Sequence, residues 1–305
     1  MDAKPVVELG RLPVANVRLE HEGFDALLAD CGVAAGVFGQ VGDPGHLEPD
    51  EVGGVMGHSL GVGLREADAH VCAEAERGHA RHSKAVAHTV PDLAALVRER
   101  RPCVVLTGAG ISTESGIPDF RSPDGIWAKH DPMEYATINA FRRNPVKVWE
   151  FYAPRFELLT SAEPNSGHLA LAELERGGLV AAVVTQNIDG LHQRAGSREV
   201  VEVHGSIRSA SCLECRERVP LEEVRAALRA APAPLCPRCG AVLKPDVVMF
   251  GELLPADAID RAIELVRGAG LLLVVGSSLE VHPVDRKSTR LNSSHSVTSR
   301  MPSSA

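Results

Sequence analysis

The chain has 305 residues and a net charge of -8. Hydrophobic residues make up 44% of it, and aromatic residues make up only 4%. This length allows one large domain or two ordinary ones, and aliphatic side chains must provide most of the core. The acidic balance disfavours nucleic acid as a partner, because attraction to phosphates needs a positive surface.

Seven cysteines are present, and four of them fall in two close pairs. The N-terminus carries no basic region followed by an apolar stretch, so we expect no secretion signal. Without such a signal, paired cysteines favour a metal site over disulfides. The longest apolar runs are only as long as a strand, so the sequence predicts no membrane-spanning helix. The sequence therefore predicts a cytoplasmic protein.

Three regions differ in character. Residues 1–84 are rich in Gly, Val, His and Glu and show few periodic stretches. We interpret them as a poorly ordered N-terminal extension, or as non-coding sequence translated from a mis-called start. Residues 285–305 form a Ser/Arg-rich run that begins abruptly where a sheet should continue. This tail predicts either a sequencing or assembly scar or a disordered end.

Residues 85–284 alternate strand and helix signals and form the predicted main domain of the chain. Apolar residues at helical spacing predict helices over 91–101, 145–159, 166–176 and 256–267. Short apolar runs predict buried strands over 103–107, 180–185, 200–203 and 271–275. Apolar strands separated by helices are typical of an α/β fold whose parallel sheet is covered on both faces.

Two C-x-x-C pairs, Cys212/Cys215 and Cys236/Cys239, are separated by twenty residues, which matches the spacing of four-cysteine zinc sites. Each C-x-x-C turn can aim two thiolates at one point, and two such turns complete a tetrahedron. Four thiolates leave no open coordination position, so the predicted Zn2+ is structural and activates no water. Four reduced core cysteines are the alternative, and this spacing argues against it.

A glycine-rich stretch, Gly108-Ala109-Gly110-Ile111-Ser112-Thr113, directly follows the strand predicted at 103–107. Glycines after a strand let backbone N–H groups approach a pyrophosphate, and the two hydroxyl side chains add donors. Thr113 stands where a dinucleotide fingerprint has its third glycine, and no Gly-Lys-Ser/Thr follows. Taken alone, the stretch is compatible with a nucleotide-binding loop or with a sharp strand-to-helix turn.

Several stretches together resemble the sirtuin family and occur in the family's order. They are 108–121, Thr185-Gln186-Asn187-Ile188-Asp189 with Leu191-His192, His204-Gly205, the four cysteines, 244–252 and 276–279. The resemblance covers about 100 to 284. It implies a doubly wound, Rossmann-like NAD-binding domain with a small zinc module inserted at about 206–244, and a substrate bound in the cleft between them.

Sirtuins pass acyl groups from protein lysines to the ribose of NAD and release nicotinamide and O-acyl-ADP-ribose, so the resemblance implies acylated lysine proteins or peptides as partners. His204 matches the catalytic base, a role that suits an imidazole. Asn187 and Asp189 match catalytic positions that hold the ribose and the carboxamide. The implied NAD contacts are Gly108, Ala109, Gly110, Ser112, Thr113, Asp119, Phe120, Arg121, Gln186, Asn187, Asp189, Gly276, Ser277 and Ser278. The implied peptide-pairing edge is Val247, Val248, Met249 and Phe250.

The acyl group is a separate expectation. Ala136, Tyr152 and Arg155 resemble the small residue and the Tyr-x-x-Arg of the branch that removes succinyl and malonyl groups. Residues three apart share a helix face, and an arginine beside a tyrosine hydroxyl can clamp a carboxylate. Acetyl is the alternative acyl group.

The sirtuin pattern stops near residue 284, where the family continues with at least one more helix and strand. Those elements supply part of the adenosine pocket and an outer strand, so we expect weaker NAD binding and an exposed sheet edge here. Two competing functions are NAD-dependent ADP-ribosyl transfer and an inactive zinc-binding module. Such a module has no need of His204 or Asn187.

Overall fold

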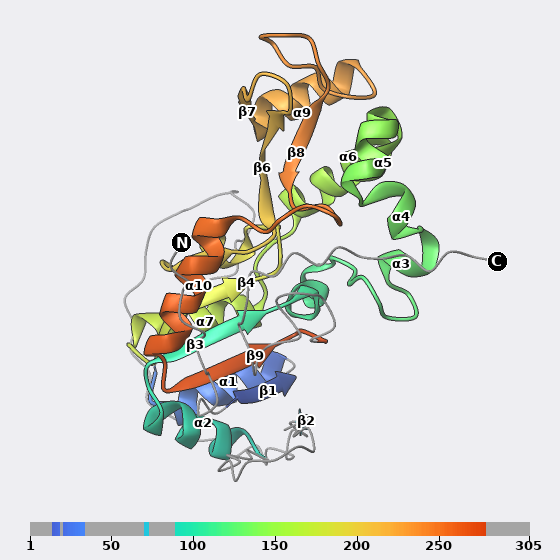
Figure 1. Cartoon of the computed structure of the whole chain (residues 1–305). Coiled ribbons are helices and arrows are strands. Elements are labelled where there is room, and N and C mark those ends of the chain that lie inside the picture. Colours follow the sequence, from blue (N-terminus) through green and yellow to red (C-terminus); the bar gives the residue numbers. More distant parts are fainter. Residues whose placement is uncertain (1–13, 19–20, 34–69, 73–88, 279–305) are drawn as a thin grey trace, which may run out of the picture.

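The computed structural model describes residues 14–18, 21–33, 70–72 and 89–278 (Figure 1). At its centre lies a six-stranded sheet in the order β2-β1-β9-β3-β4-β5. All neighbouring strands pair in parallel except β2, which is antiparallel to β1. The strands are β1 (Val14–Arg18), β2 (His70–Cys72), β3 (Cys103–Thr107), β4 (Val180–Thr185), β5 (Val200–Glu202) and β9 (Leu271–Val275).

Helices alternate with these strands along the chain. They are α1 (His21–Asp30), α2 (Val90–Glu99), α3 (Ile126–Lys129), α4 (Pro132–Tyr135), α5 (Ile138–Arg143), α6 (Pro145–Ser161), α7 (Ser166–Arg176), α8 (Leu191–Arg194), α9 (Leu221–Ala230) and α10 (Ala256–Gly268), with a 3-10 helix, η1, over Ala109–Ser115. None of these helices is long and apolar enough to cross a bilayer.

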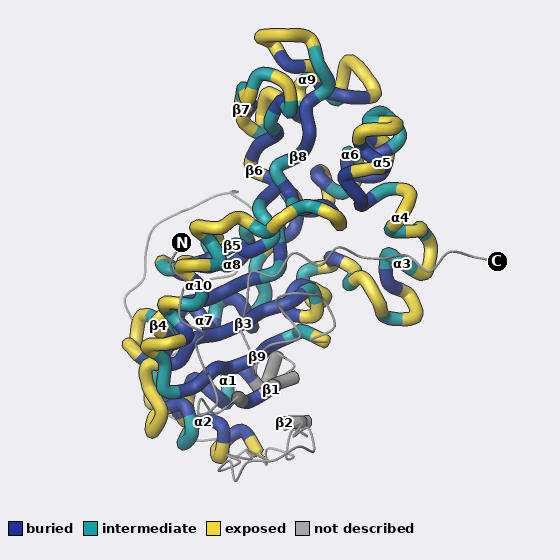
Figure 2. The backbone as a smooth tube through the Cα atoms, viewed as in Figure 1, coloured by how far each residue is buried: buried dark blue, intermediate teal, exposed yellow. Residues whose placement is uncertain are grey.

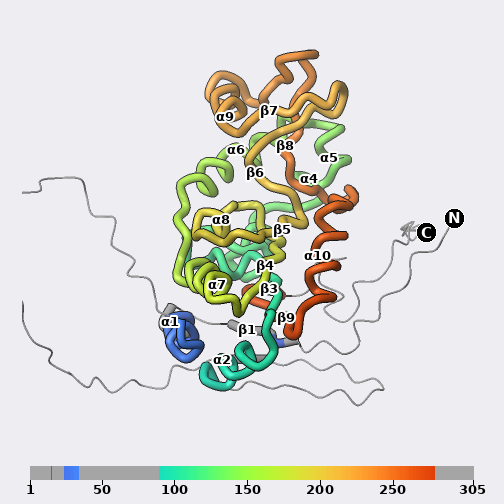
Figure 3. Tube along the Cα trace, turned by 90° about the vertical axis from the view of Figure 1, so that its left-hand side faces the viewer, coloured from blue at the N-terminus to red at the C-terminus, as the bar shows by residue number. Residues whose placement is uncertain are grey.

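The sheet is covered on both faces, as Figures 1 and 3 show from two directions. One face packs against α1, α2 and α7, and the other packs against α10. Side chains of β3 alternate between the two cores, with Val105 in the first and Val104 in the second. Every residue of β3 and β9 is buried, as the dark blue strands of Figure 2 show. Burial on both faces explains why these strands are continuous apolar runs, and the predicted α/β fold is confirmed.

Side-chain caps fix where two of the helices begin. Thr89 Oγ1 accepts the backbone N–H of Asp92 at 3.3 Å at the start of α2. Asn165 Oδ1 accepts the N–H groups of Gly167 and His168 at the start of α7. Such caps satisfy donors that have no partner within the helix.

A smaller module stands at one end of the sheet, at the top of Figure 1. It consists of α9 and an antiparallel sheet of β6 (Gly205–Cys212), β7 (Arg218–Pro220) and β8 (Leu243–Val247). Its core is continuous with that of α5 and α6, where Trp149 donates its indole N–H to the carbonyl of Leu243 at 2.7 Å. These strands bracket the insertion predicted at about 206–244.

The N-terminal region contributes to the main sheet, which the sequence analysis did not foresee. β1 pairs in parallel with β9, so the edge that we expected to be exposed after residues 271–275 is covered. Phe24, Leu27 and Leu28 of α1 are buried in the core beside α2 and α7. β2, at residues 70–72, also belongs to this region and pairs with β1. The other residues of the expected extension and the tail 285–305 lie outside the described residues.

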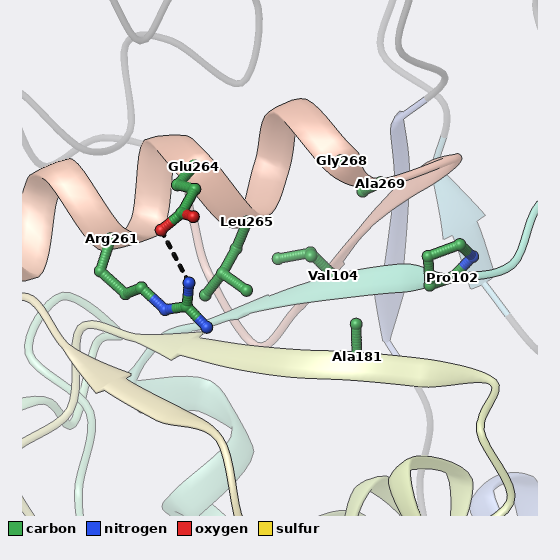
Figure 4. A pocket seen from close by; sticks show the side chains of 8 residues that line it. All are labelled: Pro102, Val104, Ala181, Arg261, Glu264, Leu265, Gly268 and Ala269. Atoms are coloured by element: carbon green, nitrogen blue, oxygen red, sulfur yellow. Dashed lines mark hydrogen bonds and ion pairs between the residues drawn. The ribbon is translucent and has the colours of Figure 1, made fainter.

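A cavity of about 200 Å³ lies between α10 and the sheet (Figure 4). Apolar side chains such as Val104, Ala181 and Leu265 line it, and Arg261 at its rim donates to Glu264 at 2.7 Å. It lies beside Pro102, just before β3 begins. Ligand sites of such sheets lie at the opposite, carboxyl ends of the strands.

Candidate active site and metal centre

Two glycine-containing turns meet at the carboxyl ends of β3 and β9. The N–H of Gly110 donates to the carbonyl of Gly276 at 2.8 Å. A Cβ on Gly108 or Gly110 would lie only 2.8 Å from that same oxygen, and Gly276 has a φ of +62°. Only glycine allows this approach of two backbones. The turns form a cradle of backbone groups of the kind that holds a pyrophosphate.

A set of buried polar side chains lies beside the cradle. Asn187 Nδ2 donates to the carbonyl of Gly108 at 3.0 Å and to Ser112 Oγ at 3.1 Å. Ser112 Oγ in turn donates to Asp189 Oδ2 at 2.8 Å, and the N–H of Leu191 donates to Asp189 Oδ1 at 2.9 Å. Burial raises the pKa of Asp189, while these two donors act to lower it. Three predicted site residues, Ser112, Asn187 and Asp189, are thus brought together.

Other predicted NAD contacts take more peripheral places. Thr113 is exposed and donates to the carbonyl of Gly110 at 2.9 Å, which closes its own turn. Gln186 Nε2 donates to Ser277 Oγ at 3.0 Å, which links the ends of β4 and β9. Ala109 lies at the start of η1, and Ser278 is exposed after β9.

Two histidines that the sequence analysis did not assign to the site lie beneath this cluster. His168 and His192 are 0% and 1% exposed, and their ring centroids are 4.9 Å apart. His168 Nε2 lies 3.4 Å from Ser112 Oγ, and His192 Nε2 lies 2.9 Å from Thr107 Oγ1. Burial lowers the pKa of His168 to about 4, and burial together with His168 lowers the pKa of His192. Both rings are therefore neutral at physiological pH.

His204 lies where β5 ends and β6 begins. Its Nδ1 lies 3.0 Å from the carbonyl of Gln186, and because a carbonyl only accepts, Nδ1 carries the hydrogen. Nε2 therefore keeps its lone pair, as a general base requires. Burial lowers the pKa of His204, while the bond to Gln186 raises it. The ring is thus a base held against the end of β4.

The predicted peptide-pairing edge continues from β8. The N–H of Val248 donates to the carbonyl of His204 at 2.8 Å, and the N–H of Phe250 donates to the carbonyl of Ala136 at 2.8 Å. Met249 is buried, whereas Phe250 is 45% exposed. The predicted substrate residue Ala136 is therefore adjacent to this edge.

Lys244 is a further residue that the sequence analysis did not assign to this edge. Its side chain is buried, and its Nζ donates to the carbonyls of Pro245 and Val247 at 3.1 Å and 2.8 Å. It also forms a 2.9 Å ion pair with Glu252. All three donors of the ammonium group are used, which fixes the backbone around Val247 to Glu252.

The predicted loop Asp119-Phe120-Arg121 forms a turn stabilised within itself. Asp119 Oδ1 accepts the N–H of Ser122 at 2.9 Å, and the N–H of Trp127 donates to the carbonyl of Phe120 at 3.0 Å. The Phe120 ring is 37% exposed and lies 5.2 Å from the ring of Trp127. Phe120 is thus an exposed aromatic side chain on a loop that follows η1 in the sequence.

Tyr152 and Arg155 lie on α6, one turn apart. Tyr152 is buried, and burial raises the pKa of its hydroxyl. The Arg155 guanidinium lies over the ring of Phe151, 3.4 Å from the centroid, and donates to the Phe151 carbonyl. Burial lowers the pKa of Arg155, and Tyr152 raises it. The structure therefore brings this pair into one partly desolvated region.

The four predicted zinc ligands converge. Their sulfur atoms all lie within 4.8 Å of one another, with Sγ–Sγ distances of 3.4 Å for Cys212–Cys239 and 3.5 Å for Cys215–Cys236. A tetrahedral zinc with Zn–S bonds near 2.3 Å needs sulfur atoms about 3.8 Å apart. The cluster therefore fits one Zn2+ with a closed, structural coordination shell.

Parallel strands that end in glycine turns with polar side chains are where α/β enzymes bind dinucleotides. The structure therefore defines a nucleotide-dependent α/β enzyme with a structural zinc module. A model of the Sir2 family matches residues 108–283. The chain belongs to the Sir2 family, and the predicted family, fold class and enzyme class are confirmed.

Known relatives agree with this assignment. NAD-dependent protein deacylase 2 of Pyrobaculum aerophilum is 51% identical over 196 residues, which cover 63% of this chain and 76% of that protein. The NAD-dependent protein deacetylase of Caldivirga maquilingensis is 47% identical, over 62% of this chain and 73% of that one. A solved Sir2 complex with a p53 peptide and NAD+ has a TM-score of 0.59 and 42% identity, over 64% of this chain and 78% of that one. NAD is therefore the cofactor of the nucleotide cradle, and zinc is the metal of the four-cysteine cluster.

Proposed function

We propose that this chain removes acyl groups from lysine side chains of proteins, consuming NAD and one water and releasing nicotinamide, the free lysine amine and O-acyl-ADP-ribose. The observation that supports it most is the position of His204. Its Nδ1–H is committed to the carbonyl of Gln186, so Nε2 is a base beside both the nucleotide cradle and the 247–250 edge. A zinc-binding module without catalysis has no use for a base at that junction.

The chain's own residues divide the work. When bound, NAD supplies the ribose that accepts the acyl group as nicotinamide leaves. Ser112, Asn187 and Asp189 hold the ribose and carboxamide through the hydrogen-bonded set described above. His204 Nε2 takes a proton from a ribose hydroxyl. Phe120 shields the reacting centre from water while nicotinamide leaves.

The acylated peptide binds as an added strand along 247–250. Hydrogen bonds in this mode come from the main chain, so the edge must be held in one conformation. The ion pair of Lys244 with Glu252 and the bonds of Lys244 to two carbonyls supply that rigidity. The partner is defined by the acylated lysine and extended backbone rather than by charge.

We propose further that the acyl group carries a carboxylate, as succinyl and malonyl groups do. Arg155 is half-buried, and among the described residues no acidic side chain forms an ion pair with it. A partly desolvated guanidinium gains more from a carboxylate than an exposed one does. Tyr152, one turn away, supplies a hydroxyl for the same group.

Residues 85–284 with the zinc module at about 206–244 constitute the proposed catalytic domain. The contacts of β1 and α1 with β9, α2 and α7 support adding residues 14–33 to it. Free cysteines that ligate zinc suit a reducing compartment, which supports a cytoplasmic location. Cell fractionation would test the location directly.

The test is an assay of the purified full chain with NAD and either an acetyl-lysine or a succinyl-lysine peptide. We expect acyl loss and nicotinamide release only when both substrates are present, with the succinyl peptide turned over faster. His204→Gln keeps a polar side chain without a basic nitrogen and should lower kcat by at least about 100-fold. A folded, zinc-loaded chain that leaves both peptides unchanged would refute the proposal, and ADP-ribosylated peptide would favour transfer instead.

A further inference from the structure

A line of buried hydrogen bonds links α8 to the ends of β3 and β4. His192 Nε2 lies 2.9 Å from Thr107 Oγ1, and Thr107 Oγ1 lies 2.8 Å from Thr185 Oγ1. The N–H of Asn187 donates to Thr185 Oγ1 at 3.1 Å. The side chains of His192, Thr107 and Thr185 are at most 3% exposed. Water therefore does not compete for these bonds.

The direction of each bond follows from counting protons. If Thr107 donates to Thr185, then Thr107 Oγ1 must accept from His192, so Nε2 carries the hydrogen. The opposite direction would place the ring hydrogen on Nδ1. That atom is buried and has no hydrogen-bond partner among the described residues. Buried N–H groups without a partner are rarer in proteins than buried acceptors without one. His192 is therefore the Nε2–H tautomer.

We propose that His192 is a positioning residue whose single donor, Nε2–H, orients the Thr107 and Thr185 hydroxyls and thereby holds Asn187 at the ends of β3 and β4. The proposal rests on the proposed function. Asn187 reaches Gly108 and Ser112 through its side-chain amide, so the chain of bonds ends at the nucleotide cradle. None of these bonds reaches the 247–250 edge or the zinc cluster.

The unpaired Nδ1 supports this assignment. An apolar side chain of similar size would fill the same space and leave no buried nitrogen unsatisfied. The hydrogen bond from Nε2 to Thr107 Oγ1 therefore explains why an imidazole, and not an apolar side chain, occupies this position. Among the residues that the structure describes, the ring of His168 is the titratable ring that contacts it, 4.9 Å away between centroids, and burial keeps both rings neutral.

The experiment compares His192→Gln with His192→Asn in the full chain. A glutamine amide can reach the place of Nε2 and donate to Thr107, whereas an asparagine amide is one carbon shorter. We expect His192→Gln to stay within about threefold of the parent, and His192→Asn to lose roughly 10- to 100-fold in kcat/KM for NAD. The KM for the peptide should not change in either variant.

Ser197→Ala is the matched control. Ser197 is buried, its Oγ has no partner among the described residues, and its N–H donates to the carbonyl of His192 at 3.0 Å. Removing this hydroxyl should change neither NAD nor peptide kinetics. Thr107→Val removes the hydroxyl next in line at constant shape and should reproduce the His192→Asn defect, which keeps the test decisive if His192→Asn does not fold.

Binding of NAD, measured by calorimetry, separates this inference from the proposed function. If the parent binds NAD without deacylating a peptide, the affinities for NAD can still be compared. An affinity that is slightly lower in His192→Gln than in the parent, and much lower in His192→Asn, would still support the positioning role. The proposal would be overturned if His192→Gln, His192→Asn and Thr107→Val all fold and all have the NAD affinity and the kcat/KM of the parent. Nitrogen NMR shifts that place the ring hydrogen of His192 on Nδ1 would also overturn it.

Discussion

Replacing Leu27 with alanine tests whether the N-terminal segment is part of the folded domain in solution. Leu27 is 1% exposed and packs in the core that α1 shares with α2 and α7. Truncating a buried leucine to alanine lowers the free energy of unfolding by about 2–5 kcal/mol, since it removes apolar contacts and leaves a cavity. For a domain of this size we expect a melting temperature roughly 4–20 °C lower.

Thermal melting of the full chain followed by circular dichroism measures this shift. Ala29→Ser on the exposed face of α1 is the control and should change stability by less than about 0.5 kcal/mol. An unchanged melting temperature for Leu27→Ala would refute the packing of α1 against the sheet. Deleting residues 1–33 should go further and cause aggregation, because it exposes the edge of β9.

Lowering the pH should destabilise the fold, because an unfolded histidine binds a proton near pH 6.5 whereas the pKa of buried His168 is about 4. The free energy of unfolding decreases as the pH falls from 6.5 toward 4, by roughly 2 kcal/mol at pH 5 from His168 alone. Urea unfolding at pH 7 and pH 5 measures this difference, and equal stability at the two pH values would contradict the prediction. Removing zinc with a chelator should unfold the β6–β8 module and shift the fluorescence of Trp149, whose indole bonds to Leu243; an unchanged spectrum after verified zinc loss would contradict this. Arg155→Leu should raise the KM for a succinyl-lysine peptide by about 10-fold or more, the effect of losing a charge-assisted hydrogen bond, and spare the acetyl peptide. Equal effects on both peptides would exclude a carboxylate clamp.

Features with a local cause could be predicted from the sequence. The bounds of β3, β4 and β9 agree with the predicted strands because each is an apolar run ended by a glycine or a polar residue. α7 likewise begins after Asn165 and ends before Gly177, as its capping residues indicate. The zinc cluster follows from spacing alone, since each C-x-x-C pair is brought together by its own turn.

Features that depend on distant contacts could not be predicted in this way. His192 and Thr107 are 85 positions apart, and only the parallel arrangement of β3 and β4 brings them together. β1 is short and gains its place from pairing with β9, far along the chain. The helix α1 did carry a readable signal, because Phe24, Leu27, Leu28 and Cys31 follow the spacing of a buried helix face.

The N-terminal helix and the nucleotide cradle are connected through α7. Phe24 packs so closely on Gly167 that a Cβ there would lie 3.0 Å from the Phe24 ring. Two residues earlier, Asn165 Nδ2 donates to the carbonyl of Ile111 in η1 at 2.7 Å. Loosening α1 should therefore disturb the cradle before it disturbs the 247–250 edge. At temperatures where Leu27→Ala is still folded, its KM for NAD should rise more than its KM for the peptide, and equal changes would mean that α1 acts on stability alone.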